Sequence, residues 1–447
     1  MTTTASSPYR SELRLAVVGN PGNRRVRLFL DAVRAAGLPA PHVVPWQAVA
    51  AGAPFGFPAG ALVRIDSPGE DAEVDRLLRG APRPARHGEI IGLRTWYHGF
   101  NRALARVADV AARDGAALLH DPAEIAVLFD KSRCHALLSA AGVAVPPALP
   151  VPALTAAAPA LPVPALTAAV APALPVPALT PAAAPALPVR APVAAFAPDG
   201  AEAGPGAAVA VGERGPRVVG AWDGLRGAMR DAGWHRVFVK TRHGSSSSGV
   251  LALQVAGARC QAVTSVELAA DGLFNSLRVR TYTDERDVAA IVERLAPEGL
   301  HVERWFPKIG FAGRTIDLRV LVIGGRPAHT VVRASRHPMT NLHLGGVRGD
   351  LDAVRTAAGP HWEAAMDSCA RAAACFPGSP HVGVDLMFGP GWRRHAIAEV
   401  NAFGDLLPNL LHDGRDTYAA QLAALAAGTP SSPAVHTAYG VATSQVV

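Results

Sequence analysis

Apolar and polar residues alternate along the first 80 positions in a way that predicts strands and helices in turn. LRLAVVG (13–19) is a continuous apolar run of the kind that forms a buried strand, and an amphipathic stretch follows it. The expected elements are strands over 13–19, 43–45 and 62–65 and a helix over 25–36. Ser67, just before Pro68, predicts the N-cap of a further helix reaching residue 78. This order predicts an N-terminal α/β domain over residues 1–118.

The second half of the chain repeats such patterns in a mixed order, typical of α+β subdomains. The expected elements are a helix over 222–232 and strands over 236–240, 250–253, 279–280, 300–305, 317–323, 330–334, 381–387 and 395–400. We expect a central subdomain of residues 119–146 and 217–255, and a C-terminal subdomain of residues 256–428. The last residues, 429–447, are rich in Ser, Thr, Ala and Pro and are expected to form a flexible tail.

Residues 147–216 interrupt this pattern with a repeat of the type PALPVPALT. Proline recurs there at every second to fourth position, which excludes a helix or a central strand. We interpret the segment as a low-complexity insertion in a surface loop, without a part in catalysis. Docking of a protein partner to this Pro-rich loop stays open.

Composition narrows the classes of function. The formal net charge is +7, but the basic residues are scattered and never form a run of five, so small anions fit better than a nucleic acid. Neither a membrane-spanning apolar stretch nor the apolar core of a signal peptide is recognisable. The four cysteines show no CxxC pair. We therefore expect a soluble, cytoplasmic protein that does not bind membranes.

Lysine is nearly missing: of the 43 basic residues only Lys131, Lys240 and Lys308 are lysines. Arginine replaces lysine wherever a solvated charge is sufficient. A lysine that persists can mark a place that needs a compact ammonium with three donors. Drift is the alternative explanation, since three is a small number.

A Ser-rich loop follows the strand that ends in Lys240. The sequence HGSSSSG (243–249) offers small residues, backbone N–H groups and hydroxyls, which suit a loop that closes over phosphates. A solvated turn is the alternative. The residues expected to contact a nucleotide here are Ser245, Ser246, Ser247, Ser248 and Gly249.

Two strands near the C-terminus carry carboxylates and an amide at matching spacing. Glu399 and Asn401 share one face of their strand, and a hairpin through 389–394 would set Asp385 beside them. Two carboxylates and an amide oxygen suit Mg²⁺, with Mn²⁺ as the alternative metal. An ordinary exposed strand face is the competing interpretation.

Arginines lie between these two groups. Arg319 follows Asp317 on one strand face, and Arg333 lies on the next strand, so the guanidinium groups can converge on phosphoryl or carboxylate oxygens. A plain Asp–Arg ion pair is the alternative. Asn341 and His343 stand in NLHLGG, whose glycines allow a ligand to approach the backbone closely.

Taken together and in this order, the segments resemble the ATP-grasp superfamily. The resemblance covers roughly residues 121–425 and is nearest to the ribosomal-protein glutamate ligases and the glutathione-synthetase-like enzymes. It is carried by FDKSRCHALLSAAGVAVPP, VFVKTRHGSSSSGV, HVERWFPK, DLRVLVI, NLHLGG and VGVD with EVN. It implies an α/β (α+β) ATP-grasp fold, in which two α+β subdomains that follow the N-terminal domain clamp a nucleotide.

The resemblance also implies roles for single residues. Lys131 and Lys240 match the lysines that bind nucleotide phosphates, and Glu303 lies in the strand whose backbone meets the adenine, with Trp305 packing near the base. The catalytic set that it implies is Arg319, Arg333, Asn341 and His343. The magnesium ligands that it implies are Asp385, Glu399 and Asn401.

The implied reaction is ATP- and Mg²⁺-dependent ligation of a carboxylate to an amine through an acyl phosphate. The substrates expected are small-molecule or peptide carboxylates and amines. A kinase of the same superfamily and a non-catalytic nucleotide-binding module are the rival hypotheses, and a homodimer stays open.

Overall fold

The structure of the chain, a computed structural model, describes residues 13–149, 220–244, 248–404 and 407–427. The chain divides into two units, and every described residue belongs to the unit formed by 1–158 and 220–447. The predicted Pro-rich insertion beyond residue 149 and the predicted tail lie outside the described residues. Among the helices that the structure describes, none combines the length and the apolar character that a membrane crossing requires.

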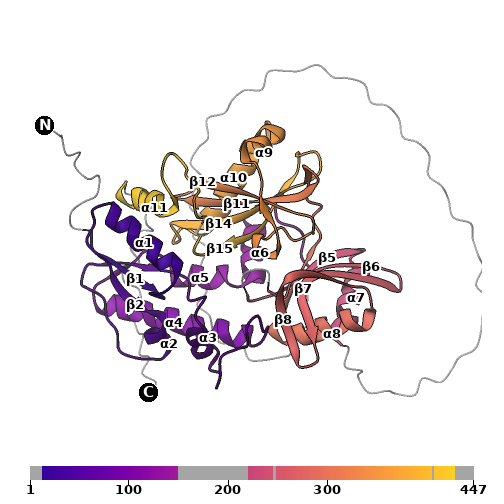
Figure 1. The fold of residues 1–447 in the computed structure, drawn as a ribbon, viewed down its shortest axis with the longest axis horizontal. Coiled ribbons are helices and arrows are strands. Elements are labelled where there is room, and N and C mark those ends of the chain that lie inside the picture. Colours follow the sequence, from indigo (N-terminus) through magenta and orange to yellow (C-terminus); the bar gives the residue numbers. More distant parts are fainter. Residues whose placement is uncertain (1–12, 150–219, 245–247, 405–406, 428–447) are drawn as a thin grey trace, which may run out of the picture. The chain divides into compact units, whose positions relative to one another are not determined.

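Four parallel strands form the first sheet, in the order β2-β1-β3-β4, and Figure 1 labels β1 and β2 together with the helices of this region. The strands are β1 (Leu15–Gly19), β2 (His42–Pro45), β3 (Leu62–Ile65) and β4 (Ala117–Leu118). The helices of this region are α1 (Arg24–Ala35), α2 (Trp46–Ala50), α3 (Ala72–Arg79) and α4 (Leu93–Arg113). Parallel strands need crossover connections, and the helices supply them. The expected α/β start is confirmed.

The helix expected from Ser67 begins later than predicted. In the structure α3 starts at Ala72, and the side chain of Asp71 caps it by accepting hydrogen bonds from the backbone N–H groups of Glu73 (3.0 Å) and Val74 (2.9 Å). The Ser67 hydroxyl instead accepts from Gly69 N at 3.2 Å, inside a turn. A carboxylate caps at least as well as a hydroxyl and also interacts favourably with the helix dipole, so Asp71 sets the start.

The second sheet is antiparallel, in the order β8-β7-β6-β5-β9. Its strands are β5 (Arg236–Thr241), β6 (Leu251–Ala256), β7 (Arg259–Ala269), β8 (Gly272–Tyr282) and β9 (Leu300–Arg304). The helical elements with it are α7 (Ala221–Asp231), α8 (Glu285–Leu295) and the 3₁₀ turn η1 (Ala296–Glu298). Apolar residues of these helices and of one sheet face form a core of their own.

The third sheet has the order β13-β12-β11-β14-β15, with β10 paired to β11. Its strands are β10 (Gly310–Phe311), β11 (Arg314–Ile323), β12 (Arg326–Ser335), β13 (Val347–Arg348), β14 (His381–Phe388) and β15 (His395–Asn401). The remaining elements are η2 (Leu342–Leu344), α9 (Leu351–Ala358), α10 (His361–Ala374), α11 (Thr417–Ala426), α5 (Pro122–Leu128) and α6 (Lys131–Ala140).

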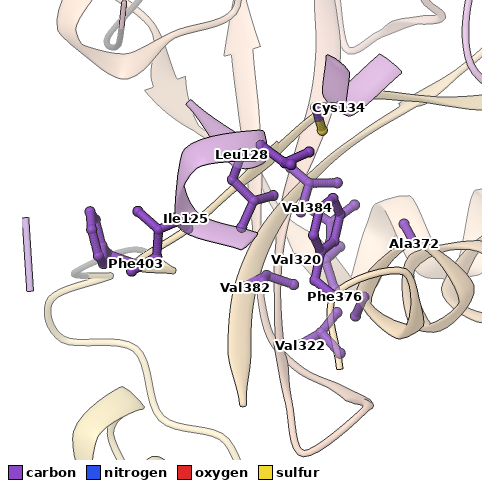
Figure 2. Close-up of a cluster of buried hydrophobic side chains, with 14 of the residues drawn as sticks. Ile125, Leu128, Cys134, Val320, Val322, Ala372, Phe376, Val382, Val384 and Phe403 are labelled. Atoms are coloured by element: carbon purple, nitrogen blue, oxygen red, sulfur yellow. The ribbon is translucent and has the colours of Figure 1, made fainter. Parts of the chain in front are cut away.

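A large apolar core joins the first and third sheets through α5 and α6. Figure 2 shows part of it: Ile125 and Leu128 of α5 lie with Val320 and Val382 of the third sheet and with Phe376 beyond α10. These side chains are at most 6% exposed. Burial of each contributes about 1.5–3 kcal/mol, so this core fixes the third sheet as a rigid support.

Candidate active site

Neighbouring strands of the third sheet bring the predicted acidic and basic residues together. The register sets Asp317 opposite Arg333, Arg319 opposite Asp385, and Asp385 opposite Glu399. Residues directly opposite each other across strands have Cβ atoms about 4.5–5.5 Å apart, within reach of one another's side chains. The hairpin expected between Asp385 and Glu399 therefore forms, and the two arginines converge on it.

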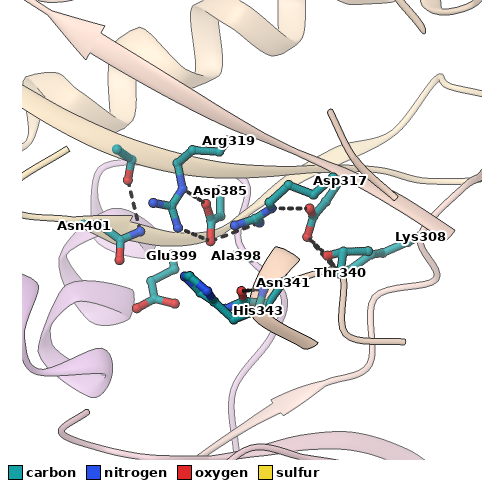
Figure 3. A network of polar contacts seen from close by, with 12 residues as sticks. Lys308, Asp317, Arg319, Thr340, Asn341, His343, Asp385, Ala398, Glu399 and Asn401 are labelled. Carbon is teal, nitrogen blue, oxygen red and sulfur yellow. Dashed lines mark hydrogen bonds and ion pairs between the residues drawn. The ribbon is translucent and has the colours of Figure 1, made fainter. Parts of the chain in front are cut away.

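Asp385 is held by both arginines (Figure 3). Arg319 donates to both carboxylate oxygens, with Nη2 at 3.2 Å from Oδ2, and Nη2 of Arg333 lies 3.2 Å from Oδ2. Burial alone would raise the pKa of Asp385, but the charges of Arg319 and Arg333 outweigh it and lower the pKa below its ordinary value. Asp385 is thus ionised at neutral pH, as a metal ligand must be.

Asp317 connects a third cation, Lys308, to the network of Arg319, Arg333 and Asp385. Its Oδ1 accepts from Nε of Arg333 at 2.7 Å, and its Oδ2 accepts from Nζ of Lys308 at 2.9 Å and from the Thr340 hydroxyl. Sequence reasoning left open whether Lys308 contacts a substrate or the ribose, and it gave Thr340 no role of its own. Three cations, Lys308, Arg319 and Arg333, face two carboxylates, and the excess of one positive charge favours an anionic ligand.

Glu399 and Asn401 project from the edge strand β15 (Figure 3). The Glu399 side chain is 31% exposed, and its Oε1 lies 3.8 Å from Nζ of Lys131. Nδ2 of Asn401 donates to the carbonyl of Gly383 at 3.2 Å, which fixes the amide and directs its Oδ1 elsewhere. Unlike Asp385, Glu399 keeps solvent access and a long ion-pair distance, so its oxygens can reach a cation.

Lys240, at the end of β5, belongs to a buried chain of polar contacts. Its Nζ donates to Oε2 of Glu303 at 2.7 Å, and Oε1 of Glu303 lies 2.8 Å from Nε2 of His301. Burial opposes the charge of Glu303, yet Lys240 and His301 lower its pKa to about 2. Burial likewise opposes the charge of Lys240, and Glu303 and Glu399 raise its pKa. Nζ of Lys240 is also 3.5 Å from the carbonyl of Ala398 in the third sheet.

Lys131 stands at the start of α6 and contacts the predicted phosphate loop. Its Nζ donates to the carbonyl of Gly244 at 2.6 Å. Gly249 closes the loop with φ +68°, and a Cβ there would lie 2.6 Å from Cγ2 of Thr241, so glycine is required. The carbonyl of Ser248 accepts from the Thr241 hydroxyl at 3.2 Å. Ser245, Ser246 and Ser247 lie outside the described residues, and their predicted contacts stay predictions.

The other predicted residues, Asn341, His343 and Trp305, lie outside the ion-pair network. Asn341 caps η2, where its Oδ1 accepts from His343 N at 3.0 Å, and Figure 3 places both residues in the close-up of the network. Trp305 follows β9, and its ring centroid is 5.1 Å from that of Phe238 on the same sheet face as Lys240. Sequence reasoning took His301 for a surface or structural residue and gave Thr340 no role, and for Lys308 its only signal was the rarity of lysine.

Comparison with known proteins shows likeness only among solved structures. No model of a known protein family and no curated protein matches the chain. The chain is similar to D-cycloserine synthetase DcsG at 14% identity, covering 93% of this chain and 99% of that one, with a TM-score of 0.48. ATP-grasp ligase PsnB complexed with precursor peptide PsnA2 and AMPPNP is similar at 16% identity, with 94% and 99% covered and a TM-score of 0.42.

A RimK domain protein ATP-grasp from Sphaerobacter thermophilus DSM 20745 is similar at 14% identity, with 92% of this chain and 98% of that one covered and a TM-score of 0.41. The helices and sheets of the structure confirm the expected α/β class, and two of the three proteins named here are described as ATP-grasp proteins. At such identities and TM-scores below 0.5 the likeness carries no argument about the reaction, which rests on the residues of the site.

Proposed function

We propose that the chain is an ATP-dependent ligase that joins a carboxylate to an amine. The observation that supports this proposal most is that cations from two sheets and from α6 lie beside β14 and β15, the strands that carry Asp385 and Glu399. Lys131 lies 3.8 Å from Glu399, Lys240 lies 3.5 Å from the carbonyl of Ala398, and Arg319 contacts Asp385. Fixed cations around ionised carboxylates are what phosphoryl transfer from a metal-bound nucleotide needs.

The donor atoms fit Mg²⁺. Glu399 and Asn401 lie two positions apart on β15 and Asp385 lies opposite Glu399, so two carboxylates and an amide belong to neighbouring strands of one sheet. In the described parts of the chain, groups of three or more His, Cys, Asp or Glu side chains suited to a metal are not found. A metal here would thus take its third ligand from the amide oxygen of Asn401. When bound, Mg²⁺ would neutralise phosphate oxygens.

In the proposed reaction the substrate carboxylate attacks the γ-phosphorus of ATP, and the bond to the bridging oxygen breaks to release ADP. The amine then attacks the carbonyl carbon of the acyl phosphate, inorganic phosphate leaves, and the amine proton passes to solvent. Lys131 and Lys240 would hold phosphates. Arg319 and Arg333, fixed by Asp385 and Asp317, would orient transferred or leaving oxygens without any nucleophilic side chain.

Product analysis tests the proposal. The full chain is incubated with ATP, Mg²⁺, hydroxylamine and a panel of acids and amines, and products are followed by ³¹P NMR and mass spectrometry. A ligase gives a hydroxamate or an amide with equal amounts of ADP and phosphate. A phosphorylated hydroxyl would instead identify a kinase, and ATP binding without turnover across the panel would identify a binding module.

Variants connect the activity to the site. Lys240→Ala and Glu399→Ala are each expected to lower ATP consumption by about 10²-fold or more, because each removes a charge at the transferring phosphate. Glu363→Ala is the matched control, since this side chain on α10 is 75% exposed. Near-normal turnover in both site variants would refute the assignment of the site even if a ligase activity were found.

A further inference from the structure

A groove separate from the proposed active site lies beside the C-terminal end of β9. Its volume is about 930 Å³, within the size range of ligand pockets. Short segments of four regions line it: 144–147, 233–236, 304–307 and 393–396, together with Ser368 and Arg371 of α10. Of the residues assigned to the proposed active site, only Trp305 also lines this groove.

The groove is strongly positive. Its five arginines are Arg236, Arg304, Arg371, Arg393 and Arg394, and among the described residues that line it there is neither Asp nor Glu. Within the described parts of the chain, none of these five guanidinium groups forms an ion pair with Asp or Glu, whereas both arginines of the active-site network do. Five exposed and unneutralised guanidinium groups around one groove attract an anionic partner.

Two of the arginines lie over tryptophan rings. The guanidinium carbon of Arg236 lies 5.8 Å from the Trp305 ring centroid, and that of Arg304 lies 5.9 Å from the Trp234 ring centroid. Stacking on an aromatic face leaves the N–H edges of a guanidinium directed outward, ready for bidentate contact with carboxylates. The order that stacking imposes lowers the entropic cost of binding.

The same stacking argues against a nucleobase as the occupant. Trp305 contacts Phe238 as well as Arg236, and Trp234 packs on the core of the second sheet as well as on Arg304. Both rings therefore already have side-chain partners, with which a stacking base would have to compete. The remaining arginines offer charge and hydrogen-bond donors from separate segments: Arg371 donates to the Ser368 hydroxyl at 2.9 Å, and Arg393 and Arg394 lie in the turn between β14 and β15.

We propose that this arginine groove binds a peptide segment rich in Asp and Glu. Several carboxylates spaced along an extended chain can reach arginines from four separate regions, whereas one small anion can engage only one or two of them. The proposal does not depend on the ligase reaction, because binding in the groove requires neither nucleotide nor turnover.

Fluorescence anisotropy tests the proposal with the full chain and no nucleotide. The probe is a fluorescein-labelled peptide of about 12 residues made of Asp, Glu and Gly, and its neutral twin carries Asn and Gln instead. The acidic peptide is expected to bind more tightly than its twin, and less tightly as salt rises. The double variant R393E/R394E is expected to weaken binding by about tenfold or more.

The matched control is R34E/R355E, which changes the net charge equally at side chains that are 79% and 62% exposed and lie outside the groove. It is expected to stay within about twofold of the parent protein. An unchanged melting temperature of both variants excludes misfolding as the cause of weaker peptide binding. If R393E/R394E has a lowered melting temperature, R393Q/R394Q is used in its place.

Four results would overturn the proposal: equal binding of the neutral twin, equal loss in the control, tighter groove-dependent binding of an oligonucleotide of equal charge, or displacement of the peptide by ATP. The last result would show that the groove belongs to the nucleotide site through Trp305.

Discussion

Replacing Glu303 by Gln tests whether the buried contact with Lys240 is an ion pair. Gln keeps the size of the side chain but removes its charge, so the buried Lys240 ammonium loses the one carboxylate that it contacts directly. The pKa of Glu303 is about 2 in the folded chain against an ordinary 4.5. That difference corresponds to about 3 kcal/mol of folding free energy at neutral pH, near the low end of the cost of breaking a buried pair. The raised pKa of Lys240 describes the same interaction and is not added.

The sign of the pH dependence follows from the lowered pKa. Stability supplied by an acid with a depressed folded pKa is complete above its unfolded pKa and is lost as the pH falls through the folded value. The difference between parent and Glu303→Gln is therefore constant from neutral pH down to about 4.5. It then shrinks, to about half near pH 3.3.

Urea unfolding at about pH 7 and about pH 3.5 measures both effects. The matched control is Glu267→Gln on β7 of the same sheet: Glu267 is 43% exposed and pairs with Arg280, which is 39% exposed. An exposed pair contributes less than about 1 kcal/mol. A Glu303→Gln penalty no larger than that of Glu267→Gln, or one that persists unchanged in acid, would refute the reasoning.

Three further outcomes follow from the structure. Gly99→Ala should lower the melting temperature strongly, because a Cβ there would lie 1.8 Å from the Leu78 carbonyl oxygen. Gly227→Ala in α7 has space for the added methyl group and should stabilise the fold by about 0.5–1 kcal/mol. Calorimetry of both variants checks that the two changes in stability have opposite signs. Burial raises the pKa of all four thiols, to about 12 for Cys134, but Cys375 alone among them is only partly buried. Cys375 should therefore react first with an aromatic disulfide reagent near pH 8, with labelling sites read by mass spectrometry. EDTA in excess over Mg²⁺ should stop ATP consumption and addition of Mg²⁺ should restore it, as followed by phosphate release.

Much of the fold could be predicted because its strands carry strong apolar signals. β1, β5, β11 and β14 are Val- and Leu-rich runs, and the structure places strands there. β7 was missed because the residues it buries near its start are Cys260, Ala262 and Thr264, which are small or polar and give no hydrophobic period. The long helix α4 was missed because it begins after Gly92 without a side-chain cap and contains Gly99, which its packing on α3 requires.

The candidate site could be predicted where a local pattern carries it. Alternation along β15 and a short hairpin were sufficient to place Asp385 opposite Glu399. The contact of Lys308 with Asp317 joins the segment after β9 to β11, and His301 beside Glu303 is contacted by Ser132 and His135 of α6. Such contacts join distant segments whose relative placement no sequence period encodes.

The three lysines gain a common explanation from these contacts. Each has its ammonium within 3.8 Å of a carboxylate: Lys131 of Glu399, Lys240 of Glu303 and Lys308 of Asp317. A guanidinium presents five N–H donors in a fixed plane, and a buried donor without a partner costs about 1–3 kcal/mol. Around Lys240 the acceptors are one carboxylate oxygen and one distant carbonyl, which suit three rotatable donors and would leave several of arginine's five unmatched. At Lys240 a compact ammonium therefore suits a charge that is needed at small volume, while arginines line the open groove.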